Sequence, residues 1–336
     1  MRHDKLPPVP MAPPDPASAV VVKAAAGSGG QSWVGSPSAL RVGDEIIMAY
    51  RLRDAARRGY AVEIARSADG VRFQTLTSIT KEQMGCESLE RPALVRTKDG
   101  IWRLYLSCAT FGTKHWRVEL LEALAPEDFD PASRRVILPG DSRLAVKDPV
   151  VVEHAGRWHL WASVHLLDDP NQTDRMRTDY ATSTDGVTWT WRGTALAPRP
   201  GEWDARGVRI AAVRFSEDGV TAFYDGRATA QQNCEERTGI AEGAEPGALA
   251  ALGTRCVAEA GHAGYGLRYL TVVDLGDGRE RLYYELTNDR GSHDLVTELR
   301  PAWVRMGAET ETETAETRIA ESDITEAKTM QAVPAA

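Results

Sequence analysis

Four acidic residues and one histidine stand where predicted β-strands begin or end. Glu90 and Asp148 begin strands in the motifs Glu-Arg-Pro and Lys-Asp-Pro. Asp225 and Glu285 follow the aromatic residue of a returning strand, and His165 ends another such strand. Carboxyl and imidazole groups can give and take protons in a reaction when they converge on one site. We predict catalytic roles for all five, with solvated, ion-paired or strand-end polar side chains as the alternative.

Basic and aromatic residues occur near the same strands. These candidates for ligand binding are Arg51, Arg91, Lys147, Arg209, Arg227, Arg268, Trp33 and Tyr269. A guanidinium group presents a rigid fork of donors that suits a carboxylate or a phosphate, and an indole can stack on a flat ligand or fill a core. If the basic groups converge, the ligand is anionic. They could equally pair with the acidic candidates as structural ion pairs, and both interpretations remain open.

The elements that would position these residues are short strands joined by tight turns. Asp-Gly or other glycine-containing turns separate β-branched and aromatic runs, as in SADGVRF, TKDGIWRLYLS and STDGVTWTW. Asp and Gly tolerate the positive φ that such hairpin turns need. An aromatic residue recurs on the returning strands at intervals of 55, 56, 63 and 59 residues, at Tyr50, Tyr105, Trp161, Tyr224 and Tyr283.

A regular repeat of hairpins with this long period is typical of a propeller. We predict an all-β fold, a five-bladed β-propeller of four-stranded antiparallel blades spanning residues 18–304, in which Val20–Lys23 completes the last blade. A two-domain sandwich is the alternative. Residues 1–17 contain six prolines, and residues 305–336 are rich in Glu, Thr and Ala. Such segments bury too little apolar surface to offset the entropy of ordering, so we predict a disordered N-terminal segment and a disordered acidic C-terminal tail.

Composition excludes several classes of function. The net charge of −8 and the pI near 5.5 argue against nucleic-acid binding, which needs a basic surface. No apolar stretch approaches the length of a membrane span, and residues 1–16 lack the apolar core of a secretory signal, so we expect a cytoplasmic protein. The four cysteines have no metal-ligand spacing. We predict no metal and no cofactor, and a small-molecule partner; the sequence indicates no oligomeric state.

Longer segments resemble a known group of proteins. ERPALVRTKDGIWRLYLS and KDPVVVEHAGRWHLWAS are similar to blade openings of the five-bladed propeller glycosidases, and SPSALRVGDEIIMAYRLR resembles the first blade of one subgroup. The group comprises the invertase, arabinanase and β-xylosidase type enzymes of glycoside hydrolase families 32 and 43, and the subgroup is the mannoside phosphorylases of family 130. The resemblance covers about residues 31–299 and implies a site where the innermost strands meet.

The same resemblance implies which residues act. Aligning the repeats puts five residues at equivalent positions around the mouth of a central funnel: Ser36, Arg91, Asp148, Arg209 and Tyr269. Glycoside hydrolysis needs two carboxyl groups across the scissile bond. Asp148 matches the Asp-Pro pattern of these families, and Glu90 is a weaker match. The chain has Gly35-Ser36-Pro37 in place of a first-blade Asp, and Arg206–Arg209 in place of a fourth-blade Glu.

The leading hypothesis is therefore a carbohydrate-active enzyme that cleaves a glycosidic bond with an atypical carboxylate set, on a sugar or another anionic metabolite. A second hypothesis keeps the fold but replaces the chemistry by that of a lyase, cyclase or isomerase of a biosynthetic pathway. A third is a non-catalytic sugar-binding propeller, because a fold does not fix a function.

Overall fold

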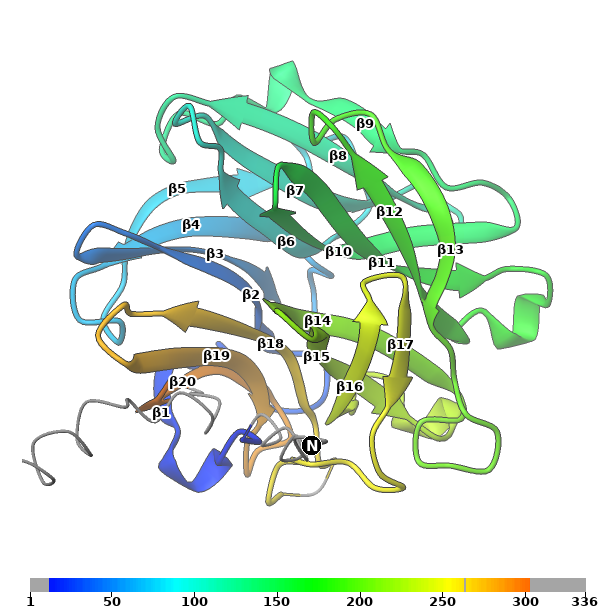
Figure 1. Ribbon diagram of the computed structural model, residues 1–336. Helices are drawn as coiled ribbons and strands as arrows, with labels where there is room; N and C mark the ends of the chain where they lie inside the picture. Colours follow the sequence, from blue (N-terminus) through cyan, green and yellow to red (C-terminus); the bar gives the residue numbers. More distant parts are fainter. Residues whose placement is uncertain (1–11, 263, 303–336) are drawn as a thin grey trace, which may run out of the picture. The chain divides into compact units, whose positions relative to one another are not determined.

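The computed structural model describes residues 12–262 and 264–302 (Figure 1). This part of the chain is all-β, as expected, with twenty strands and four short 3-10 helices. The helices are η1 (Pro16–Ser18), η2 (Pro131–Ser133), η3 (Pro170–Gln172) and η4 (Ala230–Gln232). Antiparallel pairing joins the strands into successive groups of four.

The groups follow the chain. The first contains β2 (Trp33–Val42), β3 (Glu45–Arg53), β4 (Ala61–Ser67) and β5 (Gln74–Thr80). The second contains β6 (Leu89–Arg96), β7 (Trp102–Ala109), β8 (Trp116–Ala123) and β9 (Arg135–Leu138). The third contains β10 (Leu144–His154), β11 (Arg157–Leu166), β12 (Met176–Ser183) and β13 (Thr190–Leu196). The fourth contains β14 (Gly207–Ser216), β15 (Gly219–Arg227), β16 (Arg237–Glu245) and β17 (Ala248–Ala251).

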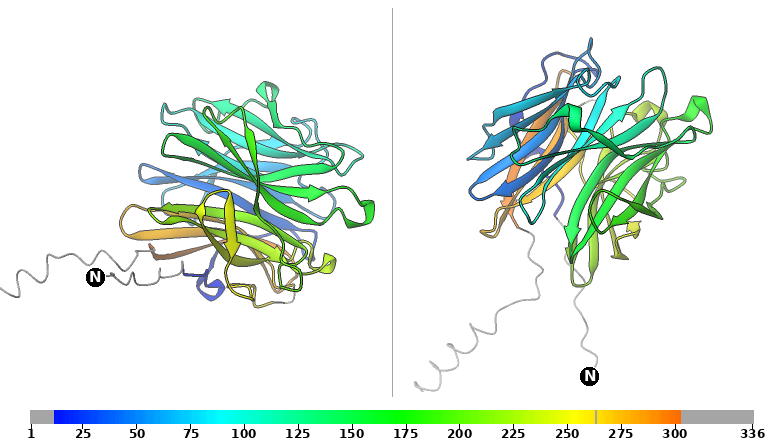
Figure 2. Two further views of the ribbon diagram at one scale, coloured as in Figure 1. Left: turned by 45° about the vertical axis from the view of Figure 1, so that its right-hand side comes forward. Right: turned by 90° about the horizontal axis from the view of Figure 1, so that it is seen from above.

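The last group is built from both ends of the described chain. It contains β18 (Leu267–Asp274), β19 (Arg279–Thr287), β20 (His293–Pro301) and β1 (Val20–Lys23), and β1 is antiparallel to β20. The expectation that Val20–Lys23 completes the final group is confirmed. The groups follow one another around the domain in chain order (Figures 1 and 2). The first strand of each group contacts the first strand of the next, and β18 contacts β2, so the first strands form a closed ring.

Each first strand is interrupted at the same place. Register shifts occur between Gly35 and Ser38, Leu89 and Pro92, Lys147 and Val150, Ile210 and Ala212, and Arg268 and Thr271. Ser36, Asp148 and Tyr269 within these bulges have φ of 52°, 55° and 57°, a region that non-glycine residues seldom occupy. A bulge changes the direction in which a side chain points. Four of the five aligned positions, Ser36, Arg91, Asp148 and Tyr269, thus lie within a bulge, whereas Arg209 lies just before one and pairs in register with Asp225.

The recurring aromatic residues lie on the second strands and are buried. Three of them fasten their group to a turn in the next. The Tyr105 hydroxyl donates to the Gly186 carbonyl at 2.8 Å, the Tyr283 hydroxyl to the Gly70 carbonyl at 2.9 Å, and the Trp161 indole to the Pro246 carbonyl at 2.8 Å. The repeat therefore reflects a repeated contact between neighbouring groups.

Apolar clusters fill the space between groups; Ile64 of β4, for example, packs with Leu104 and Leu121 of the second group. Residues 12–17, which we placed in the unstructured N-terminal segment, contact β20: the Asp15 amide donates to Glu298 at 2.9 Å. The other residues of the two predicted tails, 1–11 and 305–336, lie outside the described part of the chain.

Candidate active site

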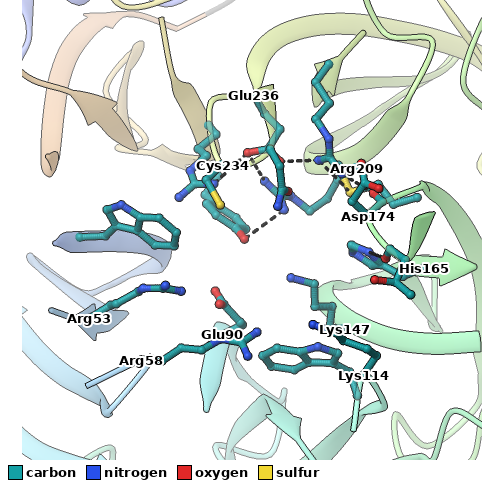
Figure 3. Close-up of a pocket in the computed structure, with 18 of the residues that line it drawn as sticks. Arg53, Arg58, Glu90, Lys114, Lys147, His165, Asp174, Arg209, Cys234 and Glu236 are labelled. Carbon is teal, nitrogen blue, oxygen red and sulfur yellow. Dashed lines mark hydrogen bonds and ion pairs between the residues drawn. The ribbon is translucent and has the colours of Figure 1, made fainter. Parts of the chain in front are cut away.

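A cavity of about 420 Å³ lies at the end of the ring where the first strands begin (Figure 3). The first strands contribute Trp33, Glu90, Lys147, Arg209, Arg268 and Tyr269. Loops between second and third strands contribute Arg58, Lys114, Thr173, Asp174, Asn233, Cys234 and Glu236. The remaining lining residues are Gln31, Arg53, Trp116, His165, Met176 and Arg227. The cavity is strongly polar and cationic, with seven Arg and Lys side chains and three carboxylates.

Three of the predicted catalytic carboxylates lie behind this wall rather than in it. Asp148, Asp225 and Glu285 are fully buried, and none of them lines the cavity. Arg51 is buried with them and contacts Glu90 and Glu285. These buried carboxylates therefore act on a ligand only through the side chains to which they are bound.

One buried network centres on Arg268. Its guanidinium contacts Glu285 at 2.5 Å and Glu236 at 2.8 Å, and Glu236 also takes a contact of 2.5 Å from Arg227. Burial disfavours the charge on Glu236, but Arg268 and the other arginines outweigh burial and hold its pKa well below the usual range. The pKa of Glu285 is likewise lowered, since the charges of Arg268 and Arg51 outweigh its burial.

A second network centres on Arg209. Its Nε and Nη2 both donate to Asp225, at 2.9 and 2.8 Å. Its Nη1 donates to the Tyr269 hydroxyl at 3.0 Å and to Asp148 at 3.2 Å. The guanidinium carbon lies 3.7 Å from the centre of the Tyr269 ring. Burial raises the pKa of Asp225 and that of Tyr269, so the phenol keeps its proton.

Glu90 is the carboxylate among the predicted catalytic residues that reaches the cavity, with Oε2 bound to Arg51. Burial opposes its ionisation, but the charges of Arg51 and Lys147 lower its pKa below the ordinary value. Glu90 is therefore an anion at neutral pH, and it supplies an acceptor to the cavity.

His165 reaches the cavity from the end of β11. Its Nδ1 lies 3.1 Å from the Thr173 carbonyl, which only accepts, so Nδ1 carries the hydrogen. Its Nε2 is buried and has no hydrogen-bond partner in the described structure. Burial, followed by the charges of Lys147 and Arg227, lowers its pKa to about 3. The ring is therefore neutral near pH 7, with a free lone pair on Nε2.

Four cations on one side of the cavity differ from the paired arginines. Arg53, Arg58 and Lys114 form no ion pair within residues 12–262 and 264–302. Lys147 pairs there with its neighbour Asp148 at 3.4 Å and lies 5.0 Å from the centre of the Trp116 ring. The guanidinium of Arg53 stacks on Trp33 at 4.1 Å. Figure 3 shows these four side chains on the same side as Glu90, across from Arg209 and Glu236. They are the cations that remain available to an anionic ligand.

Three of the predicted binding residues are placed differently from expectation, and the first, Arg51, is buried behind the wall as described above. Arg91 lies outside this cavity and lines another, of about 440 Å³. Its guanidinium donates to the backbone carbonyls of Ala211, Ile210 and Leu270, so it joins β6 to β14 and β18, the two first strands that are not its neighbours in the ring. Trp33 does line the cavity, but Arg53, Arg268 and the His293 ring already lie against its indole. A stacked sugar would have to displace one of them.

The sequence reasoning missed the contribution of the loops. Arg58, Lys114, Asp174 and Glu236 belong to the connections between second and third strands in four successive groups. The repeat could have predicted this contribution. Each returning strand ends at the same mouth of the ring, so the loop that follows it must lie at that mouth.

Within residues 12–262 and 264–302, no set of three or more His, Cys, Asp and Glu side chains is arranged to hold a metal ion. No helix in this same part of the chain has the length and hydropathy needed to cross a membrane.

Comparison with known proteins places this geometry in a structural group. No family model matches the sequence, and no curated protein matches it. Solved structures do match. A thermostable family-43 glycoside hydrolase superposes with a TM-score of 0.62 at 13% identity, over 84% of this chain and 94% of that one. The β-1,2-mannobiose phosphorylase from Listeria innocua gives 0.61 at 14% identity, over 86% and 92%. A glycosyl hydrolase from Bacteroides ovatus gives 0.58 at 15% identity, over 80% and 85%.

The fold is that of the propeller-type glycosidases. The expected resemblance to glycoside hydrolase family 43 and to the mannoside phosphorylases is confirmed at the level of structure. Glu90, Asp174 and Glu236 line the described cavity, and the pKa of each is lowered. Hydrolysis by an acid–base pair uses one carboxyl group with a raised pKa, whereas the pKa of each of these three carboxyl groups is lowered.

His165 should make stability depend on pH. Its pKa is about 3 in the folded chain against 6.5 unfolded, so below pH 6.5 the unfolded state binds a proton that the folded state does not. This contribution to stability is complete above pH 6.5 and is lost as pH falls toward 3, by about 1.4 kcal/mol per pH unit. Urea unfolding from about pH 6 to pH 4 should show this extra slope in the wild type and its loss in His165→Gln.

The matched control is His154→Gln, whose ring stacks on Phe215 outside the cavity. It should keep the wild-type slope. Equal slopes for wild type and His165→Gln would contradict the neutral, buried state assigned to His165.

Proposed function

We propose that this protein is a carbohydrate-active enzyme that cleaves the glycosidic bond of an anionic sugar in the cavity around Glu90. The propeller-type fold supports the substrate class, because similar structures include glycoside hydrolases and a mannobiose phosphorylase. We include in this proposal that the five groups of four strands are the blades of a five-bladed propeller. Its cavity then lies at the mouth of the central funnel, the usual place for a concave ligand site.

The observation that carries the proposal is the set of cations without ion-pair partners. Arg53, Arg58 and Lys114 stand free of carboxylates at the cavity wall, with Lys147 deeper on the same side. Unpaired cations close together repel one another, and an anionic group of the substrate would relieve that repulsion. A uronate carboxylate or a sugar phosphate has the charge and the acceptor geometry that arginine recognises.

The remaining cavity groups supply contacts for sugar hydroxyls. Glu90 offers an ionised acceptor, and Gln31 and Asn233 add amide groups to the wall. These polar groups on a rigid scaffold fix the orientation of a ligand.

A binding experiment tests the substrate class. Titration calorimetry should show binding of uronate oligosaccharides and none of their neutral counterparts of the same linkage. Arg58→Ala should weaken the uronate affinity about tenfold, because a hydrogen bond to a charged group contributes about 1.5–3 kcal/mol. Rising salt should reduce the affinity further.

The control is Arg66→Ala, an exposed arginine on β4 that does not line the cavity; it should bind like the wild type. Equal affinity for neutral and anionic oligosaccharides would refute the anionic substrate. Tight binding without any bond cleavage would instead identify a sugar-binding module.

A further inference from the structure

The cavity holds proton-transfer groups that are not carboxylic acids. Besides its carboxylates and arginines, the wall carries five titratable side chains: His165, Tyr269, Cys234, Lys114 and Lys147. Two of them stand in opposite protonation states. His165 presents an unprotonated Nε2, and Tyr269 presents a protonated phenol. A base and an acid are therefore both available in one cavity whose carboxylates are held as anions.

The position of His165 leaves its Nε2 able to act as a base. Nε2 is a buried acceptor with no partner among the described residues, and the bond from Nδ1 to Thr173 fixes both the ring and the tautomer. A buried polar atom gains from a hydrogen-bond partner, so Nε2 can accept a hydrogen from a molecule bound in the cavity. The positive charges of Lys147 and Arg227 weaken this base in the empty cavity. An anionic substrate would offset those charges and so strengthen the base when it binds.

Tyr269 is held in place from three directions. Its backbone has φ of 57° in the β18 bulge, its amide donates to Asp225 at 3.1 Å, and its hydroxyl accepts from Arg209 at 3.0 Å. The same hydroxyl donates to Asp148 at 3.4 Å, and this long hydrogen bond is given up when the proton passes to the substrate. If the phenol gives up its proton, the adjacent Arg209 charge stabilises the phenolate. The contact with Arg209 thus allows the Tyr269 hydroxyl to act as a proton donor.

The cations on the same side of the cavity as Glu90 complete the requirements of a particular reaction. Removal of a proton from the carbon next to a carboxylate places negative charge on that carboxylate, and nearby cations stabilise the developing charge. Lys147 lies among the groups that set the charge environment of His165, and Arg53 and Arg58 stand on the same side of the cavity as Lys147 (Figure 3).

We propose that the cavity cleaves a uronate glycoside by β-elimination, with His165 Nε2 as the base and the Tyr269 hydroxyl as the acid. His165 takes the proton from the carbon α to the carboxylate. The electron pair of that C–H bond forms a C=C bond to the β carbon, and the bond from the β carbon to the glycosidic oxygen breaks. That oxygen leaves with the electron pair and takes the phenolic proton of Tyr269.

The step is balanced without any co-reactant. The proton on His165 returns to the Tyr269 phenolate through solvent, which restores both groups. No water is consumed, and the two products together have the composition of the substrate. This inference rests on the proposed anionic sugar substrate and adds the reaction by which the bond is broken.

The test uses the full chain and uronate oligosaccharides whose glycosidic oxygen lies on the carbon β to the carboxylate. Mass spectrometry should find two fragments whose masses sum to that of the substrate, and ultraviolet absorbance should rise as the conjugated C=C bond forms. His165→Gln and Tyr269→Phe should each lower the rate by about 100-fold, the usual contribution of a positioned acid or base. His154→Gln and Tyr265→Phe, which change residues outside the cavity, should keep the wild-type rate.

The outcomes separate the two proposals. Fragments whose masses sum to the substrate plus one water, with no rise in absorbance, would overturn elimination and leave an anionic-sugar hydrolase. Failure of the wild type to bind uronates would refute the substrate class, and with it this reaction. Thermal unfolding of each variant shows whether it is folded, and the mass balance of the wild type decides the reaction without any variant.

Discussion

Replacing Arg268 by Met should lower the free energy of unfolding by about 3–5 kcal/mol, the usual cost of removing one partner from a buried ion pair. Arg268 contacts Glu285 and Glu236, and all three side chains are nearly or fully buried. Without the guanidinium, both carboxylates lose the cation that they share, and the fully buried Glu285 cannot reach water in its place. Chemical denaturation monitored by tryptophan fluorescence measures the difference.

The control for this change is Arg66→Met, an exposed arginine on β4, which should alter stability by no more than about 0.5 kcal/mol. A second variant, Glu285→Gln, removes one of the two negative charges with which Arg268 forms ion pairs. Combined with Arg268→Met, it should cost less than the sum of the two single changes, because the stranded charge is gone. Strict additivity would show that the network is not coupled.

Replacing Arg209 by Lys should reduce kcat for the anionic substrate by about 100-fold or more, with a smaller effect on KM. Arg209 uses one edge of its guanidinium for Asp225 and its other nitrogen for Tyr269 and Asp148. A lysine keeps the charge but offers one compact head group, so it cannot hold the Tyr269 oxygen and Asp225 together. Steady-state kinetics on the uronate oligosaccharides provide the measurement.

Arg237→Lys is the matched control, since Arg237 pairs with Glu259 at 3.0 Å away from the cavity. It should leave kcat unchanged. A rise in KM with kcat preserved in Arg209→Lys would mean that Arg209 only binds substrate and does not position Tyr269 for proton transfer.

The all-β class and the order of the hairpins were predictable from the sequence because both arise from local signals. Asp69-Gly70 illustrates this. The Asp69 carboxylate accepts from the amides of Val71 and Arg72, at 2.9 and 2.8 Å, while Gly70 takes φ of 73°. The turn is thus encoded by two adjacent residues. The aromatic repeat was also visible, since Tyr105, Trp161 and Tyr283 make a similar contact.

The site was less predictable because its chemistry depends on partners from distant groups. Glu90 was recognised as a carboxylate at a strand start, but its ionised state depends on Arg51, which is 39 residues away. Asp225 looked equally available, yet Arg209 and the Tyr269 amide occupy its oxygens. Glu236 attracted no attention because it lies in a loop without a motif, although three arginines converge on it.

The roles of the arginines also depend on partners from distant parts of the chain. The two interpretations of the basic residues, ligand binding and structural pairing, proved to describe different members of the set. Arg51 and Arg268 are paired with buried carboxylates, whereas the unpaired cations are mostly residues that sequence alignment did not single out, such as Arg58 and Lys114. The equivalent positions of the repeats identified the ring of first strands. The loops beside this ring supply most of the unpaired cations of the cavity.

The pairing of β1 with β20 has a consequence for synthesis on the ribosome. β1 leaves the exit tunnel early, but its partner is made much later; Ala25 and Asp294, which bond across this closure, are 269 residues apart. Throughout translation β1 therefore remains an unpaired strand, with the exposed Val20 and Val21. An unpaired apolar edge invites pairing with other chains. We therefore expect chaperones to bind β1 of the nascent chain until β20, its partner, has left the ribosome.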